Sequence, residues 1–232
     1  MIIRVAERAS RSGASKIVIA TDDQEIVSVA EAHGYQATLT RADHPSGTDR
    51  IAEVCQRLNA EAQQVIVNVQ GDEPMMDPAL ITAVAKRLTD EPGASVSTAA
   101  VPIMDGESLQ SPHVVKVVCN AAGHALYFSR APIPYHRDQW PSLQQLSLRH
   151  TTETAPWLRH LGIYGFRASA LAEFVTWPSA PIERTEQLEQ LRWLWQGRAI
   201  AVHIAREAPH AGVDTPEDLD RVRALWSSTQ TD

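Results

Sequence analysis

One ten-residue segment, Val65-Ile66-Val67-Asn68-Val69-Gln70-Gly71-Asp72-Glu73-Pro74, points most directly to the fold class. Its first five residues are apolar apart from one asparagine, which is typical of a strand covered by helices on both faces. A polar turn follows at once. Because ligands of open α/β sheets bind beyond the carboxyl ends of the strands, we expect Gln70 and Asp72 to lie at a binding edge.

Outward from this segment, apolar strands and amphipathic helices alternate along the chain. Helices are expected at residues 2–13, 23–33, 48–58 and 78–88, and strands at residues 16–20, 35–39 and 94–101. This alternation predicts an α/β fold with a mixed, mostly parallel sheet and helices on both of its faces.

The pattern changes after Val114. Two apolar runs, at 114–119 and 124–129, are separated by a short turn and predict a hairpin. The proline-rich residues 131–156 show no periodicity, so we expect a single domain over residues 1–232 with a hairpin and arm excursion at 113–156. The later elements expected are strands at 161–166 and 199–205, helices at 169–176 and 183–195, and a final helix capped by Thr215.

Composition excludes several classes of function. A formal net charge of -7 over 232 residues argues against nucleic-acid binding, which requires a basic surface. No run approaches the ~18 apolar residues of a membrane-spanning segment, so no membrane partner is expected. Cys55 lies in a helical pattern and Cys119 ends an apolar run; we expect both to be buried thiols in a cytoplasmic protein.

Two aspartates are candidates for a metal site. Asp72 follows the most apolar strand, and Asp214 precedes the capped final helix. Mg²⁺ is usually held by one or two carboxylates together with substrate phosphates, which suits such a pair. From the residues alone, an equally good interpretation is that Asp72 starts a tight turn and Asp214 complements the helix dipole.

Two loops could bind part of a nucleotide. The segment 40–50 leads into a helix and contains Gly47, Thr48 and Arg50. Small residues allow close approach of a ligand, and the first amide groups of the helix are free to bind an anion. Thr21 and Asp22 follow an earlier strand in a similar way. Taken alone, both loops are explained better as ordinary helix caps.

A group of polar side chains could bind an acidic sugar, because charge-assisted hydrogen bonds fix the orientation of a carboxylate. The cations are Lys116 and Arg130, and segment 159–164 adds His160 and Tyr164. His160 taken alone is interpreted better as a core histidine. On the helix expected at 183–195 most carboxylates should face solvent, but one or two residues could face a cleft and bind sugar hydroxyls.

The order of these motifs is more specific than each motif. The set resembles the 3-deoxy-manno-octulosonate (KDO) cytidylyltransferase family, the CMP-KDO synthetases, from Met1 to about Leu225 and more weakly in the arm at 135–156. The segments that carry the resemblance are Thr21-Asp22-Asp23, Arg41-Ala42-Asp43-His44, Ser46-Gly47-Thr48, Asn68 to Pro74, Tyr127-Phe128-Ser129-Arg130, Arg159 to Gly165, Leu188-Glu189-Gln190-Leu191-Arg192 and Gly212 to Leu219.

The resemblance implies a Rossmann-like nucleotide-diphospho-sugar transferase fold, CTP and KDO as substrates, Mg²⁺ as cofactor, and a homodimer that serves lipopolysaccharide synthesis. It also implies roles for individual residues. Asp72 and Asp214 would be the catalytic metal ligands; Thr21, Asp22, Gly47, Thr48, Arg50 and Gln70 would surround the nucleotide; Arg130, His160, Tyr164, Glu189 and Gln190 would bind the sugar. Transfer to another acidic sugar and a non-catalytic paralogue are the alternatives.

One departure from the family concerns the start of the chain. Members of the family begin with a strand and a loop rich in Arg, Gly, Pro and Lys that binds the triphosphate, whereas Met1 aligns inside the first helix. We therefore expect the domain to be incomplete at its N-terminus and to lack a central strand. The two strands beside that position would then have unpaired backbone groups.

Overall fold

The computed structural model describes residues 1–138, 157–209 and 212–229. The helices are α1 (Ile2–Ser10), α2 (Gln24–Ala32), α3 (Gly47–Arg57), α4 (Pro78–Thr89), α5 (Gly106–Gln110), α7 (Ala168–Phe174), α8 (Pro181–Glu186), α9 (Leu191–Trp195) and α10 (Pro216–Thr229). The strands are β1 (Val18–Thr21), β2 (Gln36–Leu39), β3 (Val65–Asn68), β4 (Val96–Pro102), β5 (Lys116–Cys119), β6 (Ala125–Ser129), β7 (Leu158–Arg167) and β8 (Ile200–Ile204).

The larger sheet is mixed, as expected, and strand β7 interrupts its parallel arrangement. Strand β7 pairs antiparallel with β3, β4 and β5, and β5 pairs antiparallel with β6. Within this sheet, among the described residues, only β4 and β8 pair in parallel. Strands β3 and β4 thus run in the same direction but are separated by β7, which enters the sheet after the hairpin. Hydrophobic periodicity does not encode strand direction, so the sequence could not reveal this insertion.

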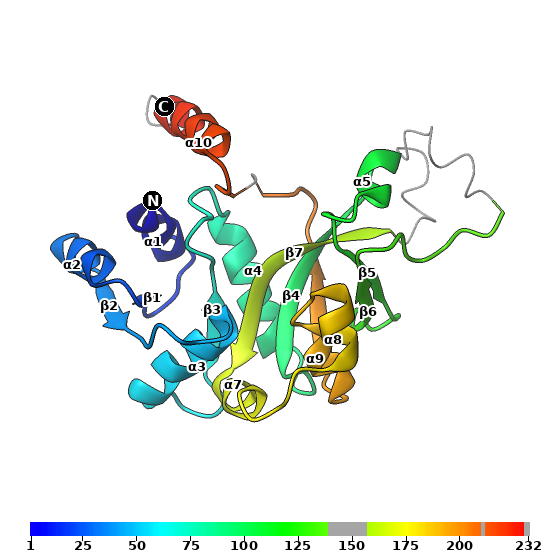
Figure 1. Cartoon of the computed structure of the whole chain (residues 1–232), viewed down its shortest axis with the longest axis horizontal. Coiled ribbons are helices and arrows are strands. Elements are labelled where there is room, and N and C mark those ends of the chain that lie inside the picture. The colour runs from blue at the N-terminus through cyan, green and yellow to red at the C-terminus, as the bar shows by residue number, and fades with distance from the viewer. Residues whose placement is uncertain (139–156, 210–211, 230–232) are drawn as a thin grey trace.

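Helices cover both faces of this sheet. Figure 1 shows α4 on one face and α7, α8 and α9 on the other. On the α4 face, Val84 and Ile163 belong to one apolar cluster. On the opposite face, the rings of Phe174 and Trp193 stack with centroids 4.8 Å apart beside Phe166. The sheet is therefore a buried central layer, as the apolar strands predict.

Strands β1 and β2 form a separate parallel pair (Figure 1). Among the described residues β1 pairs only with β2, and β3 pairs only with β7. A cavity of about 1210 Å³ lies between these two open edges, lined by residues 17–20, by residues 65–70 and by α1, α3 and α4. Among the described residues, each of these two strands therefore has one edge without a partner strand.

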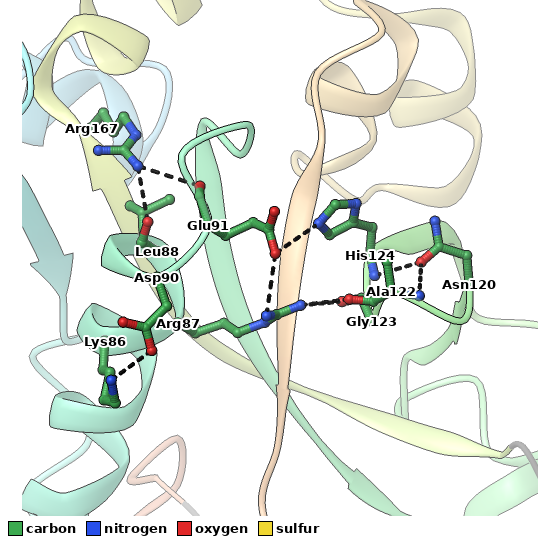
Figure 2. Close-up of polar contacts among 10 residues, drawn as sticks. All are labelled: Lys86, Arg87, Leu88, Asp90, Glu91, Asn120, Ala122, Gly123, His124 and Arg167. Atoms are coloured by element: carbon green, nitrogen blue, oxygen red, sulfur yellow. Dashed lines mark hydrogen bonds and ion pairs between the residues drawn. The ribbon is translucent and has the colours of Figure 1, made fainter.

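The hairpin of β5 and β6 is confirmed, and its turn is tied to the end of α4 (Figure 2). Arg87 donates a hydrogen bond of 2.8 Å to the carbonyl of Ala122, and Glu91 lies 3.5 Å from both Arg87 and His124. These contacts fix the hairpin relative to the sheet. The expected arm lies mostly at residues 139–156, outside the described part of the chain.

The helix expected at 183–195 is broken into α8 and α9, which corrects that prediction. Gln187 adopts a left-handed conformation with φ of 54°. The break lets Arg192 fold back onto the buried Glu183, with a hydrogen bond of 2.9 Å from Nε. The sequence shows both charges, but not that they pair inside the core. The start of α10 is as expected, because Thr215 and Asp218 cap each other reciprocally.

Two smaller expectations concern the whole chain. No helix in the described ranges is long and apolar enough to cross a membrane.

Cys55 is buried and Cys119 half-buried, and both are free thiols. Burial raises the pKa of each thiol to about 11, so both stay protonated at neutral pH and are poor nucleophiles.

Candidate active site

The first part of the site lies beyond the end of β3. Oδ1 of Asp72 and Oε2 of Glu73 are buried and have no hydrogen-bond partner among the described residues. The amide of Val213 donates to the carbonyl of Asp72 at 2.9 Å, so the segment that leads to Asp214 lies against this turn. The contact is close, because a Cβ on Gly212 would be only 3.1 Å from the Asp72 carbonyl oxygen.

The electrostatics of this turn show that three carboxylates share a small volume. The pKa of Glu73 is raised to about 7, chiefly by burial and then by the charges of Asp72 and Asp214, while Arg159 lowers it. A cation would relieve this repulsion, and the unpaired oxygen of Asp72 is a suitable ligand. Within the described residues, no group of three or more His, Cys, Asp or Glu side chains could hold a metal ion.

The second part lies at the carboxyl end of β1. Arg50 on α3 forms an ion pair of 3.1 Å with Asp22 and donates a hydrogen bond of 2.6 Å to the hydroxyl of Thr40. The Arg50 guanidinium lowers the pKa of Asp22, which is ionised at neutral pH. The Thr21 side chain accepts from the amide of Asp23 at 3.1 Å. The structure thus brings Arg50 to the turn of Thr21 and Asp22, although Arg50 lies far from them in the sequence.

The start of α3 combines a helix cap with an open position. Ser46 is the N-cap and accepts from the amide of Asp49, as the ordinary-cap interpretation predicts. Gly47 is exposed, and a Cβ there would meet nothing within 4 Å, so a ligand has room beside it. Thr48 is buried, and its hydroxyl donates to the carboxylate of Glu189. This bond joins the residues predicted for the nucleotide to those predicted for the sugar.

His160 is held by Thr98 and is uncharged. Its Nε2 lies 2.9 Å from the Thr98 hydroxyl, which itself lies 2.8 Å from the carbonyl oxygen of Ile163. Because that hydroxyl proton goes to the carbonyl, His160 Nε2 is the donor and Nδ1 is the acceptor. Burial lowers the pKa of His160 to about 3. The ring also packs on Phe128, with centroids 4.9 Å apart, so these contacts fit the interpretation of His160 as a core histidine.

Arg130 is also partly engaged. Its Nε donates to the Glu186 carbonyl at 2.8 Å, NH1 donates to the Pro112 carbonyl at 2.9 Å, and NH2 approaches the Gln187 carbonyl at 3.4 Å. A guanidinium carries five N–H groups, so two of them have no partner among the described residues and could bind a ligand. Lys116, the other expected cation, is fully buried and donates only to backbone carbonyls, so it cannot bind a sugar directly.

The cavity between the two sheets joins most of these groups. Its lining includes seven predicted residues, namely Gly47, Thr48, Arg50, Gln70, Asp72, Tyr164 and Glu189. Burial and then the Glu189 charge raise the pKa of Tyr164, so its phenol stays protonated and can donate. The predicted residues outside this lining are Thr21, Asp22, Arg130, His160, Gln190 and Asp214. Gln190 is buried in the turn before α9.

Sequence reasoning missed Glu73, Thr98 and Glu186. Glu73 stands beside Asp72 in the printed motif, but nothing in the sequence shows that its carboxyl group is buried. Glu186 accepts from the hydroxyl of Ser129 at 2.6 Å and from the amide of Arg130 at 3.0 Å. Its partners lie 56 and 57 residues away, so no local pattern could identify them.

Comparisons with known proteins agree with this geometry. A family model described as cytidylyltransferase matches residues 1–200. A solved structure of CMP:2-keto-3-deoxy-manno-octonic acid synthetase complexed with CTP is 38% identical, with a TM-score of 0.86. The match covers 98% of this chain and 88% of that one. With its ordered motifs gathered around one cavity, this chain belongs to the cytidylyltransferase family.

Proposed function

We propose that this protein transfers CMP from CTP to KDO and releases pyrophosphate. The observation that carries the proposal is the shared cavity, whose lining includes Arg50 and Gly47 from the nucleotide side, Tyr164 and Glu189 from the sugar side, and Asp72. The similar solved structure is named for this sugar and contains CTP.

In the proposed reaction, the anomeric hydroxyl of KDO attacks the α-phosphorus of CTP in line with the leaving pyrophosphate. Asp72 and Asp214 would hold Mg²⁺, which would neutralise phosphate charge when bound. The buried, unpaired oxygen of Asp72 supports this role. Arg50 and the open position at Gly47 would orient the nucleotide, because reactions of this class depend mainly on positioning and on charge.

The proposed sugar site divides its tasks among several groups. The two free N–H groups of Arg130 would bind the sugar carboxylate, since a guanidinium suits that geometry. Glu189 would accept from sugar hydroxyls and Tyr164 would donate to them. His160, being neutral, would accept a hydroxyl proton at Nδ1 rather than bind the carboxylate.

Three further properties are proposed from the resemblance to the family: a homodimer, a cytoplasmic location and a role in lipopolysaccharide synthesis. Light scattering coupled to gel filtration tests the first. A monomer at all concentrations measured would contradict it.

The test of the activity measures pyrophosphate release from CTP with Mg²⁺ and a panel of acidic sugars. Release with KDO supports the proposal, and release only with a sialic acid or an amino variant of KDO favours that sugar. If no sugar supports release by a well-folded sample, the non-catalytic alternative is favoured. Asp72→Asn and Asp214→Asn should each lower kcat/KM by roughly 10²- to 10³-fold and leave the fold intact.

Asp220→Asn is the matched control, because Asp220 is an exposed aspartate on α10, near Asp214 in the sequence. It should retain the activity of the unmodified protein. Near-normal turnover by Asp72→Asn or Asp214→Asn would show that the metal assignment is wrong. Calorimetric titration of Mg²⁺ in the presence of CTP provides a readout that does not depend on turnover.

A further inference from the structure

Lys116 is a fully buried cation outside the proposed reaction. It lies on β5, and its Nζ donates to the carbonyls of Ser111 at 2.9 Å, Val114 at 2.7 Å and Arg130 at 2.6 Å. An ammonium group has three N–H groups, so these bonds use all of them. Lys116 can therefore affect a ligand only through the backbone segments whose carbonyls it binds.

Burial of this charge lowers the stability of the fold. Burial of a charged group costs several kcal/mol unless its partners are well placed, and no carboxylate contacts Nζ among the described residues. The flanking strand residues are apolar, so an apolar side chain would suit the position as well. The three carbonyls are the groups that need a donor here, because without Lys116 their oxygens would lose these bonds.

The carbonyls belong to two separate segments, and Arg130 links both to a third. Ser111 and Val114 lie in the loop before β5, whereas Arg130 follows β6. The Arg130 side chain then reaches back to the Pro112 carbonyl in that loop and to the Glu186 carbonyl at the end of α8. Lys116 therefore holds the main chain of Arg130, and Arg130 ties the loop to α8.

The end of α8 leads directly into the proposed sugar site. Gln187, in its left-handed conformation, follows Glu186 and is two residues before Glu189. Glu189 accepts from Thr48 and lines the shared cavity. A shift of the Arg130 backbone would thus move the guanidinium itself and the segment that carries Glu189.

We propose that Lys116 is a positioning residue for the acidic sugar, which rests on the function proposed above. By holding the carbonyl of Arg130, it aims the remaining guanidinium N–H groups at the sugar carboxylate and keeps Glu189 in place. In the described part of the chain, no hydrogen bond joins its side chain to the residues that surround Arg50 on the nucleotide side. Its loss should therefore affect the sugar far more than CTP.

The test uses Lys116→Met, which keeps an unbranched side chain but removes the three donors. Arg198→Met is the control, because Arg198 is an exposed cation that pairs with Glu173 and does not line the shared cavity. We expect the KM for KDO to rise roughly tenfold or more in Lys116→Met, with the KM for CTP within about twofold of the unmodified protein. Equal increases in both KM values, or a loss of thermal stability alone, would overturn the proposal.

A second measurement does not depend on turnover. Amide hydrogen exchange of Lys116→Met should become faster at residues 111–115 and 187–190, with little change in β4. A uniform increase over all elements would mean that Lys116 only supports the fold. If the unmodified protein does not use KDO, the proposed function fails, and the exchange pattern still decides whether Lys116 holds these segments. Lys116→Gln, which retains an amide donor, replaces the methionine variant if that variant does not fold.

Discussion

Replacement of Glu73 by glutamine tests the charge balance at the end of β3. Glutamine has nearly the same shape, but it cannot ionise. In the unmodified protein the pKa of Glu73 is raised to about 7 from its ordinary value of 4.5, first by burial and then by Asp72 and Asp214. The folded protein therefore keeps a proton on Glu73 at pH values where the unfolded chain has lost it.

The sign and size of the effect follow from these two pKa values. Because the pKa is higher in the folded state, protonated Glu73 stabilises the folded protein. This contribution is complete below about pH 4.5 and is lost as the pH rises through 7. At 1.36 kcal/mol for each pKa unit, a fully buried group with this shift would lower the free energy of unfolding by about 3 kcal/mol over this pH range. Glu73 is partly exposed, so we expect a loss of about 1 to 2 kcal/mol.

The assay is urea unfolding of both proteins at about pH 5 and about pH 8 with a chelator present. The free energy of unfolding of Glu73→Gln should increase relative to the unmodified protein between these pH values. Glu217→Gln, which removes an exposed carboxylate at the start of α10, controls for the loss of one negative charge. A difference that stays constant with pH would refute the reasoning. Mg²⁺ with CTP should reduce the pH dependence, because a nearby cation favours ionised Glu73.

Two further predictions concern packing. Thr98→Val should lower the free energy of unfolding by about 1 to 3 kcal/mol in urea titrations, because it leaves His160 Nε2 without its acceptor; Thr98→Ser should restore most of the loss. Gly165→Ala should lower the melting temperature markedly, because its Cβ would lie 2.5 Å from Ser97 Oγ, whereas Gly93→Ala, with open space around it, should not; equal melting temperatures would contradict this packing.

Local patterns predict the elements of this fold well. Periodicity places α1 to α4 and the β5–β6 hairpin within a few residues, and the Thr215 cap locates the start of α10. Strand order and direction depend on contacts between distant segments, so the position of β7 between β3 and β4 could not be read from the pattern. The division into α8 and α9 likewise depends on a tertiary ion pair, which overrides helix propensity.

The candidate site could also be predicted only in part from the sequence. Motif order identifies Asp72, Arg50 and Glu189, and the structure places all three on one cavity. Protonation depends on burial, which a residue type does not reveal. Burial keeps His160 neutral, in line with its interpretation as a core histidine, and makes Glu73 a titrating group that the motif did not mark.

The separation of β1 and β2 from the larger sheet has a consequence for cooperativity. No ladder among the described strands joins the two parts; α1 contacts α4, and α3 contacts both β1 and α7. Helix packing alone couples such units less tightly than a continuous sheet, so calorimetry should record two overlapping heat-absorption peaks rather than one all-or-none transition. Asp22 belongs to the smaller unit, whereas Asp72 belongs to the larger one. A nucleotide that contacts both would act as a crosslink and merge the two peaks into one.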